Sequence, residues 1–337
     1  MQDLKDFYQN IVCQIWPSDR YSAILEIHDV IVVNFDCLYD RECSIRGLDQ
    51  LIYLLHQKGK NKRFIFISED GANITNSAAL RVIENIRDCF LLNEQTCAVV
   101  CREDINIDDV LVINYPSIPY WCNTLYQHIK TINIPAGPFT KKFAVWFNRG
   151  TYYRLDIARH LYDHYRDVSY ISYQEQGMIA DRKLSEYFPN KQWAEKNTPI
   201  VYDELFPNRV FDFDLIVGEN RKPYNDYFME IVAETDILSN SWITEKTVKN
   251  LYIGKPFILM SGVNSLRTIH SYGFKTFSQW IDESYDRENN IHTRLEMIKE
   301  EINRIARLSL EELNQIHQQM IPIFEHNRAV YEDITRR

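Results

Sequence analysis

The sequence predicts an α/β protein built from two Rossmann-like halves. Strand-like and helix-like segments alternate along most of the chain, and a stretch with Pro and Gly, residues 132–138, interrupts them near the middle. A length of 337 residues is enough for two domains, each with its own core. We therefore predict an N-terminal domain over residues 1–135 and a C-terminal domain over 141–315. A last helix over 316–337 could pack back on the N-terminal domain.

The first half contains four stretches typical of buried strands, because β-branched, aromatic and other apolar residues dominate them. They are residues 24–35, 63–68, 97–101 and 110–113. Two segments with helical periodicity, 48–56 and 76–93, flank the second of these strands. This alternation predicts a doubly wound sheet with helices on both faces.

The second half repeats the alternation. Its predicted strands are residues 143–147, 168–171, 211–217 and 256–260. Its predicted helices are residues 153–165 and 244–252, and the chain is helical from about 290 to its end. In open α/β sheets, ligands bind at the carboxyl ends of the strands, so we expect the functional residues there.

Composition excludes several classes of function. A net charge of −9 argues against a nucleic-acid partner, because binding to phosphate backbones depends on clustered Lys and Arg. No window approaches the roughly 20 apolar residues that a membrane span needs. The first residues lack the basic and apolar regions of a signal peptide, so we expect a cytoplasmic protein. The seven cysteines contain no CxxC pair, which favours free buried thiols over zinc or disulfides.

The first segment with chemical potential is Trp242-Ile243-Thr244-Glu245-Lys246, at the start of a predicted helix. The N–H groups and dipole of a helix start attract anions, and Lys246 adds positive charge, so a diphosphate could bind there. Glu245 could accept hydrogen bonds from ribose hydroxyls. The alternative is an ordinary solvated helix start, where a glutamate merely complements the dipole.

A second segment leads from a predicted strand through Asn148, Arg149 and Gly150 into a helix that begins near Arg154. An arginine at a helix start is unfavourable for the helix dipole, and residues that break a local rule are functional candidates. The guanidinium group also suits phosphate oxygens. The alternative is a surface arginine close to Asp156.

The third segment places Glu69 and Asp70 directly after the strand predicted at 63–68. A carboxylate at that position could remove a proton from an acceptor hydroxyl. The alternative is a turn, since Asp70-Gly71 is a strong turn signal. No metal site is predicted, and Asp212-Phe213-Asp214 is interpreted as structural because it lies inside a strand-like run.

Taken together, these segments resemble the α1,3-fucosyltransferase family. The run from Trp242 to Lys246, followed by a helix and Gly254-Lys255-Pro256, is similar to that family's donor-binding motif. Glu234-Thr235 looks like its Glu-Asn pair, with Thr in place of Asn. The spacing between Asn148 and Arg154 is similar to its strand–Asn–loop–Arg segment.

The resemblance covers residues 141–282, and only the architecture agrees before that. The continuation from Leu266 to Phe277 is unlike the fucosyltransferases and more similar to uncharacterised phage and bacterial relatives. The resemblance implies a GT-B fold, in which two Rossmann-like domains face each other across a cleft. It implies an inverting, metal-independent glycosyltransferase without a cofactor. The donor would be a GDP- or UDP-linked sugar, GDP-fucose-like being favoured, and the acceptor a glycan hydroxyl.

The resemblance also implies roles for single residues. Arg154 and Lys246 would bind the donor diphosphate, and Glu245 would contact the ribose. Glu69 is the closest match to the family's catalytic base, with Asp70 as its alternative. The remaining residues expected at the donor site are Asn148, Arg149, Glu234, Trp242 and Thr244.

Two other functions stay open. The first is a nucleotide-sugar-modifying enzyme of another reaction type, such as an epimerase, although no GxGxxG follows the first strand as an NAD site would need. The second is a non-catalytic carbohydrate-binding protein, which would not bind a nucleoside diphosphate. The sugar, the acceptor and the oligomeric state are not specified by the sequence.

Overall fold

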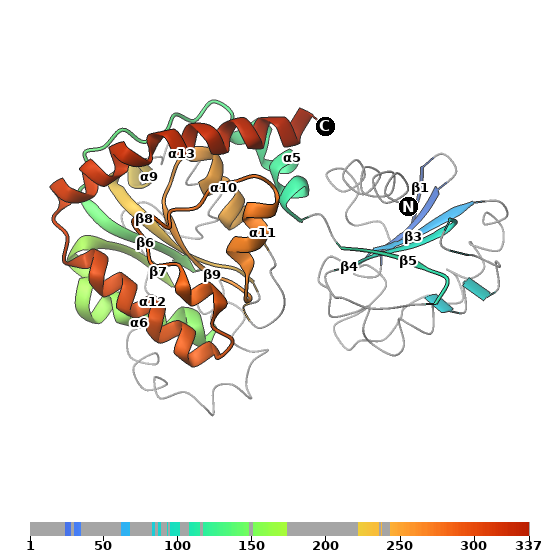
Figure 1. The fold of residues 1–337 in the computed structure, drawn as a ribbon, viewed down its shortest axis with the longest axis horizontal. Coiled ribbons are helices and arrows are strands. Elements are labelled where there is room, and N and C mark those ends of the chain that lie inside the picture. Colours follow the sequence, from blue (N-terminus) through green and yellow to red (C-terminus); the bar gives the residue numbers. More distant parts are fainter. Residues whose placement is uncertain are drawn as a thin grey trace. The chain divides into compact units, whose positions relative to one another are not determined.

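The chain folds into two compact units, Met1–Tyr120 and Trp121–Arg337, in a computed structural model (Figure 1). Both units contain a largely parallel sheet, so the predicted α/β class is confirmed. The structure describes residues 24–27, 30–34, 62–67, 83–84, 87–88, 93, 95–101, 108–114, 117–147, 151–173, 222–235, 237 and 243–336.

The first unit contains a five-stranded sheet with the order β1-β2-β3-β4-β5. Its strands are β1 (Ile24–Ile27), β2 (Val30–Asn34), β3 (Arg63–Ile67), β4 (Cys97–Cys101) and β5 (Leu111–Asn114). Strands β2 to β5 are parallel, and successive residues of β2 and β3 are buried. Side chains on both faces of these strands therefore lie in the core, which explains their continuous apolar runs.

The single strand predicted at 24–35 is wrong. β1 and β2 are two strands that pair antiparallel, with Ile27 opposite Val30. Both strands contain β-branched residues, so the apolar pattern does not reveal that the chain reverses between them. Within the helix predicted at 76–93, residues 83–84 and 87–88 are helical. The helix predicted at 48–56 lies outside the described residues.

The second unit contains a parallel sheet with the order β7-β6-β8-β9. Its strands are β6 (Lys141–Phe147), β7 (Ser169–Tyr173), β8 (Tyr227–Ala233) and β9 (Phe257–Met260). Three of them match predicted strands, but the interior strand β8 was not predicted. The strand predicted at 211–217 lies outside the described residues.

Helices cover both faces of this sheet. They are α5 (Ser117–Ile129), α6 (Tyr152–Tyr165), α9 (Lys222–Asp226), α10 (Glu245–Ile253), α11 (Ser265–Ser271), α12 (Ile291–Ala306) and α13 (Leu310–Arg336). Two short 3-10 helices are η1 (Arg166–Val168) and η3 (Ser284–Arg287). Figure 1 shows α6 and α12 on one face of the sheet and α10 and α13 on the other. The two helices on each face contact each other.

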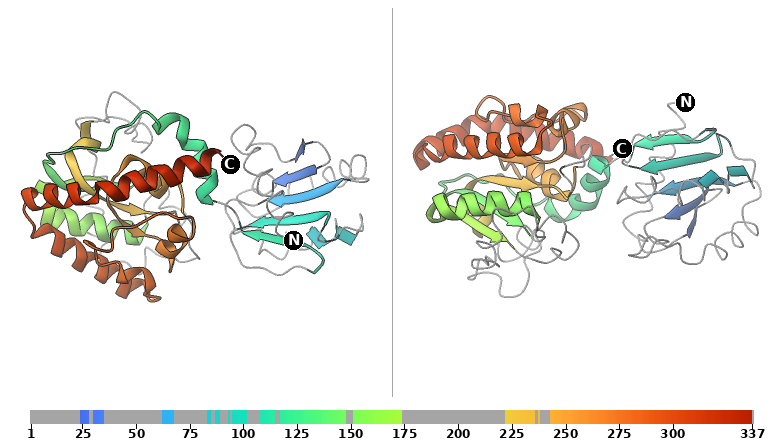
Figure 2. Two further views of the ribbon diagram at one scale, coloured as in Figure 1. Left: turned by 45° about the horizontal axis from the view of Figure 1, so that its top comes forward. Right: turned by 90° about the horizontal axis from the view of Figure 1, so that it is seen from below.

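Helix α13 is continuous across the domain boundary predicted between 315 and 316. The left view in Figure 2 shows it as one long helix that ends at the C-terminus. It packs on α10, β6 and β8 of its own unit. Its start follows from the sequence Ser309-Leu310-Glu311-Glu312, a capping box. The Ser309 backbone N–H donates to Glu312 Oε2 (2.7 Å) and the Glu312 N–H donates to Ser309 Oγ (3.1 Å).

The stretch predicted as a linker, residues 132–138, is tied to α13 by side-chain hydrogen bonds. Arg328 donates to the carbonyl of Ile132, and Gln318 donates to the carbonyl of Ala136 (3.3 Å). Helix α5 also contacts α13, since the rings of Tyr126 and Tyr331 lie 6.4 Å apart. These contacts explain why the unit boundary lies at residue 120 and not at 135.

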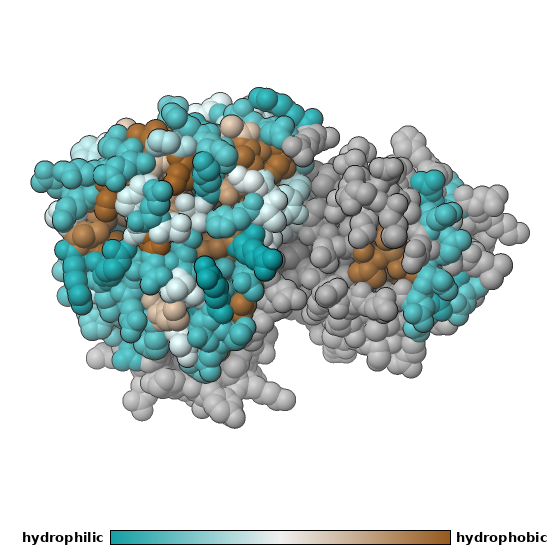
Figure 3. Space-filling model, viewed as in Figure 1, coloured by the Kyte–Doolittle hydropathy of each residue, from teal (hydrophilic) through white to brown (hydrophobic). Residues whose placement is uncertain are grey.

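The surface of the second unit is largely hydrophilic on the face drawn in Figure 3, with apolar residues in small scattered groups. Among the described residues, no helix is both long enough and apolar enough to cross a membrane.

Two of the seven cysteines, Cys97 and Cys122, have described side chains, and both are buried and free. Burial raises the pKa of the Cys97 thiol to about 12. Free buried thiols are thus confirmed at these two positions.

Candidate functional site

The strand order of the second unit contains a topological switch point. From β6 the chain passes through α6 to β7 on one side, whereas the later strand β8 lies on the other side of β6. Connections that leave neighbouring strands toward opposite sides open a crevice at the carboxyl ends of those strands, where ligands of open α/β sheets bind. The segments at this position are the start of α6, after β6, and the start of α10, after β8.

Helix α10 begins where the sequence predicts it. Thr244 is its N-cap, in an extended conformation (φ −118°, ψ −172°), and its hydroxyl oxygen faces the backbone N–H of Lys246 at 3.5 Å. Glu245 provides an acidic residue in the first turn, which complements the helix dipole. The helix ends at Gly254, whose left-handed conformation (φ 74°) is typical of a helix C-terminus.

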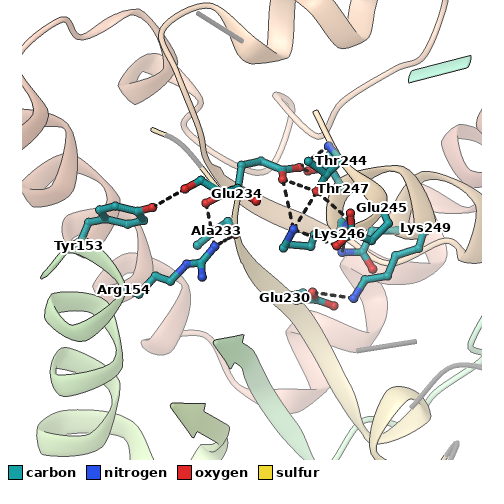
Figure 4. A network of polar contacts seen from close by, with 12 residues as sticks. Tyr153, Arg154, Glu230, Ala233, Glu234, Thr244, Glu245, Lys246, Thr247 and Lys249 are labelled. Atoms are coloured by element: carbon teal, nitrogen blue, oxygen red, sulfur yellow. Dashed lines mark hydrogen bonds and ion pairs between the residues drawn. The ribbon is translucent and has the colours of Figure 1, made fainter. Parts of the chain in front are cut away.

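The carboxylate of Glu234, directly after β8, joins that strand to the first turn of α10 (Figure 4). It is completely buried. Oε1 accepts hydrogen bonds from the Thr244 N–H (2.9 Å) and the Thr247 hydroxyl (2.6 Å). Oε2 accepts a hydrogen bond from the Thr244 hydroxyl. Three donors therefore compensate for the loss of water around this charge.

Lys246 is the cation of this cluster that solvent reaches, with 24% of its side chain exposed. Its ammonium group donates to Glu245 Oε1 (2.9 Å) and to Thr244 Oγ1 (3.0 Å), and it lies 3.8 Å from Glu234 Oε2. Burial would raise the pKa of Glu245, but the adjacent Lys246 ammonium outweighs burial and holds that pKa below its ordinary value. Glu245 is therefore ionised at neutral pH, and it forms a partly exposed ion pair with Lys246.

Arg154 approaches the same point from α6 and is buried. Its Nη2 donates to the carbonyls of Ala233 (2.9 Å) and Glu234 (2.8 Å), at the end of β8. Its guanidinium carbon lies 5.9 Å from the ring centres of both Phe147 and Tyr153. These contacts account for an arginine in the first turn of a helix, where the dipole opposes it, because its charge is directed at carbonyl oxygens of the neighbouring strand.

A second buried arginine connects three neighbouring segments by donating hydrogen bonds to their backbone carbonyls. Arg294 of α12 donates through Nη1 to the carbonyls of Ser261 (2.6 Å) and Ile237 (3.3 Å). Its Nε donates to the carbonyl of Glu288 (2.8 Å). Burial lowers the pKa of Arg294. Arg294 thus joins the segment after β8, the end of β9 and the segment before α12.

Five of the residues predicted at the site come together in the structure: Arg154, Glu234, Thr244, Glu245 and Lys246 (Figure 4). The other predicted site residues lie outside the described residues, and they are Asn148, Arg149, Trp242, Glu69 and Asp70.

Sequence reasoning missed two members of the cluster. Thr247 binds Glu234, and the Tyr153 hydroxyl donates to the carbonyl of Thr235 (3.0 Å). Thr247 follows Thr244 at a spacing of three, which puts both hydroxyls on one side of a helix start, and this signal could have found it.

Within the described ranges, no group of three or more His, Cys, Asp or Glu side chains is arranged to hold a metal ion. Comparison of the chain with models of protein families, with curated proteins and with solved structures found no significant match.

Proposed function

We propose that the second unit binds a nucleoside diphosphate at the carboxyl ends of β6 and β8. The observation that supports this most is the Lys246 ammonium group, which is partly exposed at the N-terminus of α10, beside the switch point of the sheet. A helix N-terminus and a lysine together attract a diphosphate. Glu245 becomes free to accept hydrogen bonds from the ribose when a phosphate takes its place on Lys246.

Within this class, the proposed protein is a glycosyltransferase of the GT-B type that uses a sugar nucleotide, with a GDP-linked sugar favoured. The support is the resemblance of residues 141–282 to the fucosyltransferases, together with the clustering of Arg154, Glu234 and Lys246 at one edge of a parallel sheet. In this proposal the first unit binds the glycan acceptor, and Glu69 or Asp70 follows β3 of that unit.

The proposed reaction is an inverting displacement. Glu69 takes the proton of the acceptor hydroxyl as that oxygen attacks the anomeric carbon, and the bond between this carbon and the diphosphate oxygen breaks. Lys246 stabilises the negative charge that develops on the leaving diphosphate. No metal is required in this scheme, so turnover in excess EDTA should equal turnover with magnesium.

Calorimetric titration of the full chain with GDP, UDP and dTDP tests the proposal. We expect one of the three to bind, and Lys246→Ala to weaken its binding by about 10- to 100-fold, the worth of a hydrogen bond to a charged group. Lys130→Ala is the matched control, because Lys130 is exposed at the end of α5 and bonds Gln127 there. Absence of binding by all three nucleotides would contradict the proposal.

Incubation with the corresponding nucleotide sugar distinguishes the remaining functions. A glycosyltransferase releases the free nucleoside diphosphate, at a rate that increases with a suitable acceptor glycan. An epimerase would change the sugar and leave it attached to the nucleotide. A carbohydrate-binding protein would leave the donor intact and would not bind the nucleotide.

A further inference from the structure

Glu234 is placed to act on the donor site without touching the donor. Its side chain has no exposed surface. All three of its hydrogen-bond donors belong to Thr244 and Thr247, in the N-cap and first turn of α10. Because Oε1 already accepts two hydrogen bonds, and Oε2 accepts one beside the Lys246 ammonium, no part of the carboxylate faces a ligand.

The Thr244 hydroxyl links Glu234 to Lys246. A hydroxyl has one proton, and here that proton is donated to Glu234 Oε2. The lone pairs of Thr244 Oγ1 are therefore left for Lys246, whose ammonium lies 3.0 Å away and whose backbone N–H lies 3.5 Å away. The carboxylate thus orients the hydroxyl so that it accepts from the lysine.

Glu234 is also connected to the second basic residue of the cluster. Its backbone carbonyl accepts a hydrogen bond from Arg154 Nη2 (2.8 Å), and its own N–H donates to the carbonyl of Met260 at the end of β9 (2.9 Å). The backbone of Glu234 is therefore held between α6 and β9, while its side chain holds α10. Glu234 thus connects Arg154, Thr244 and Lys246.

We infer that Glu234 is a positioning residue: it directs Lys246 toward the donor diphosphate through Thr244 and does not contact the nucleotide. This inference rests on the proposed function, and it differs from the sequence-based expectation that Glu234 binds the donor itself. The amide in Glu234→Gln has the same shape, but its NH₂ group faces the Thr244 hydroxyl as a donor. The hydroxyl must then accept from the amide, and Lys246 loses both the carboxylate and an oriented acceptor.

A double-mutant cycle on the affinity for GDP tests the inference. We expect Glu234→Gln to weaken GDP binding by about tenfold in the wild-type background and by less than about twofold in the Lys246→Ala background, as for two residues that act as one unit. Equal effects in both backgrounds would mean that Glu234 acts independently of Lys246, and would overturn the inference. A Glu234→Gln variant that loses thermal stability but binds GDP normally would also overturn the inference.

A second readout needs no nucleotide. The rate at which an amine-reactive ester acylates Lys246, measured by peptide mass spectrometry, should rise severalfold in Glu234→Gln, with the exposed Lys130 as internal reference. If the wild type binds no nucleotide but this rate rises, the proposed function fails and the positioning role stands. An unchanged rate would overturn the positioning role.

If Glu234→Gln does not fold, Thr244→Val breaks the same link while keeping the shape of the side chain. It should weaken GDP binding and raise the acylation rate of Lys246, and Thr244→Ser, which restores the hydroxyl, should reverse both effects. Normal GDP binding and a normal acylation rate in Thr244→Val would overturn the inference.

Discussion

At the scale of single residues, Lys255 has the most unusual environment among the described cations. It is completely buried, its ammonium donates to the carbonyl of Tyr227 (2.6 Å), and it lies 4.3 Å from the ring centre of Tyr227 and 4.9 Å from that of Phe139. Burial lowers the pKa of Lys255 from 10.5 to about 7, although the charges of Glu230 and Asp226 partly oppose this.

This pKa predicts an unusual pH dependence of stability. Between pH 7 and 10.5 the unfolded chain binds a proton at Lys255 that the folded chain does not. The free energy of unfolding should therefore rise with pH in this window, by at most about 1.4 kcal/mol per pH unit, and should not change below it. Urea unfolding at pH 7 and pH 9 should show the wild type gaining roughly 2 kcal/mol relative to Lys255→Met. A difference that does not change with pH would contradict this assignment.

Glu69 is the residue on which the proposed chemistry depends. General-base catalysis is worth about 10²–10⁴ in rate, so Glu69→Gln should lower kcat by at least about a hundredfold. The affinity for the nucleotide should stay nearly constant, because the proposed donor site lies in the second unit. Asp70→Asn is the matched control. If this variant and not Glu69→Gln loses activity, Asp70 is the base, and if both remain active the base lies elsewhere, with Glu26, Asp29 and Asp36 the next residues to test.

At the scale of elements, the start of helix α10 depends on local sequence, whereas its end also depends on tertiary packing. Its start follows from local sequence, since Thr244 caps it and Glu245 complements its dipole. Its end at Gly254 depends on packing as well as on backbone conformation. A Cβ atom on Gly254 would lie 2.9 Å from Ile134 Cγ2 and 3.1 Å from Phe324 Cγ.

Gly254→Ala should therefore cost more than the conformational penalty alone. The left-handed conformation costs a residue with a Cβ about 1–2 kcal/mol, and the steric conflict adds about 1–3 kcal/mol. Gly273→Ala is the matched control, because Gly273 has φ +89° but its Cβ would meet Val330 only at ordinary distances of 3.7 Å and 3.8 Å. Chemical unfolding should show the larger loss for Gly254→Ala. Equal losses would show that Ile134 and Phe324 do not constrain this turn.

The strand β8 shows why one element escaped prediction. Its sequence, YFMEIVA, contains Glu230 within an otherwise apolar run, although every residue is buried. Glu230 is tolerated because it pairs with Lys249 of α10 at 3.2 Å and accepts hydrogen bonds from the hydroxyls of Tyr224 (2.8 Å) and Tyr227 (2.9 Å). A buried charge is stable only with such partners, and the partners of Glu230 lie up to 19 residues away from it in the sequence.

At the scale of the whole molecule, the limits of the second unit can be tested. Residues 121–140 belong to its core, because the Tyr126 ring lies 5.9 Å from that of Tyr252 and the Phe139 ring 4.8 Å from that of His317. A fragment over 117–337 should unfold cooperatively by circular dichroism. A fragment over 141–337 should unfold at least about 10 °C lower, since it loses several buried apolar side chains worth about 1.5–3 kcal/mol each. Equal melting temperatures would show that this segment contributes nothing to the unit.

Local patterns in the sequence determined the α/β class, most strands of both sheets, the start of α10 and the order of the candidate site residues along the chain. Each of these depends on interactions between neighbours in sequence, such as apolar periodicity and helix capping. Tertiary structure alone decided that β1 and β2 are two strands, that β8 lies beside β6, and that residues 132–138 pack on α13. Tertiary structure also decided that Glu234 and Arg154 are buried and connect neighbouring segments, whereas Lys246 is partly exposed to solvent. Burial and pairing of charges depend on partners that are distant in sequence, and no local pattern contains them.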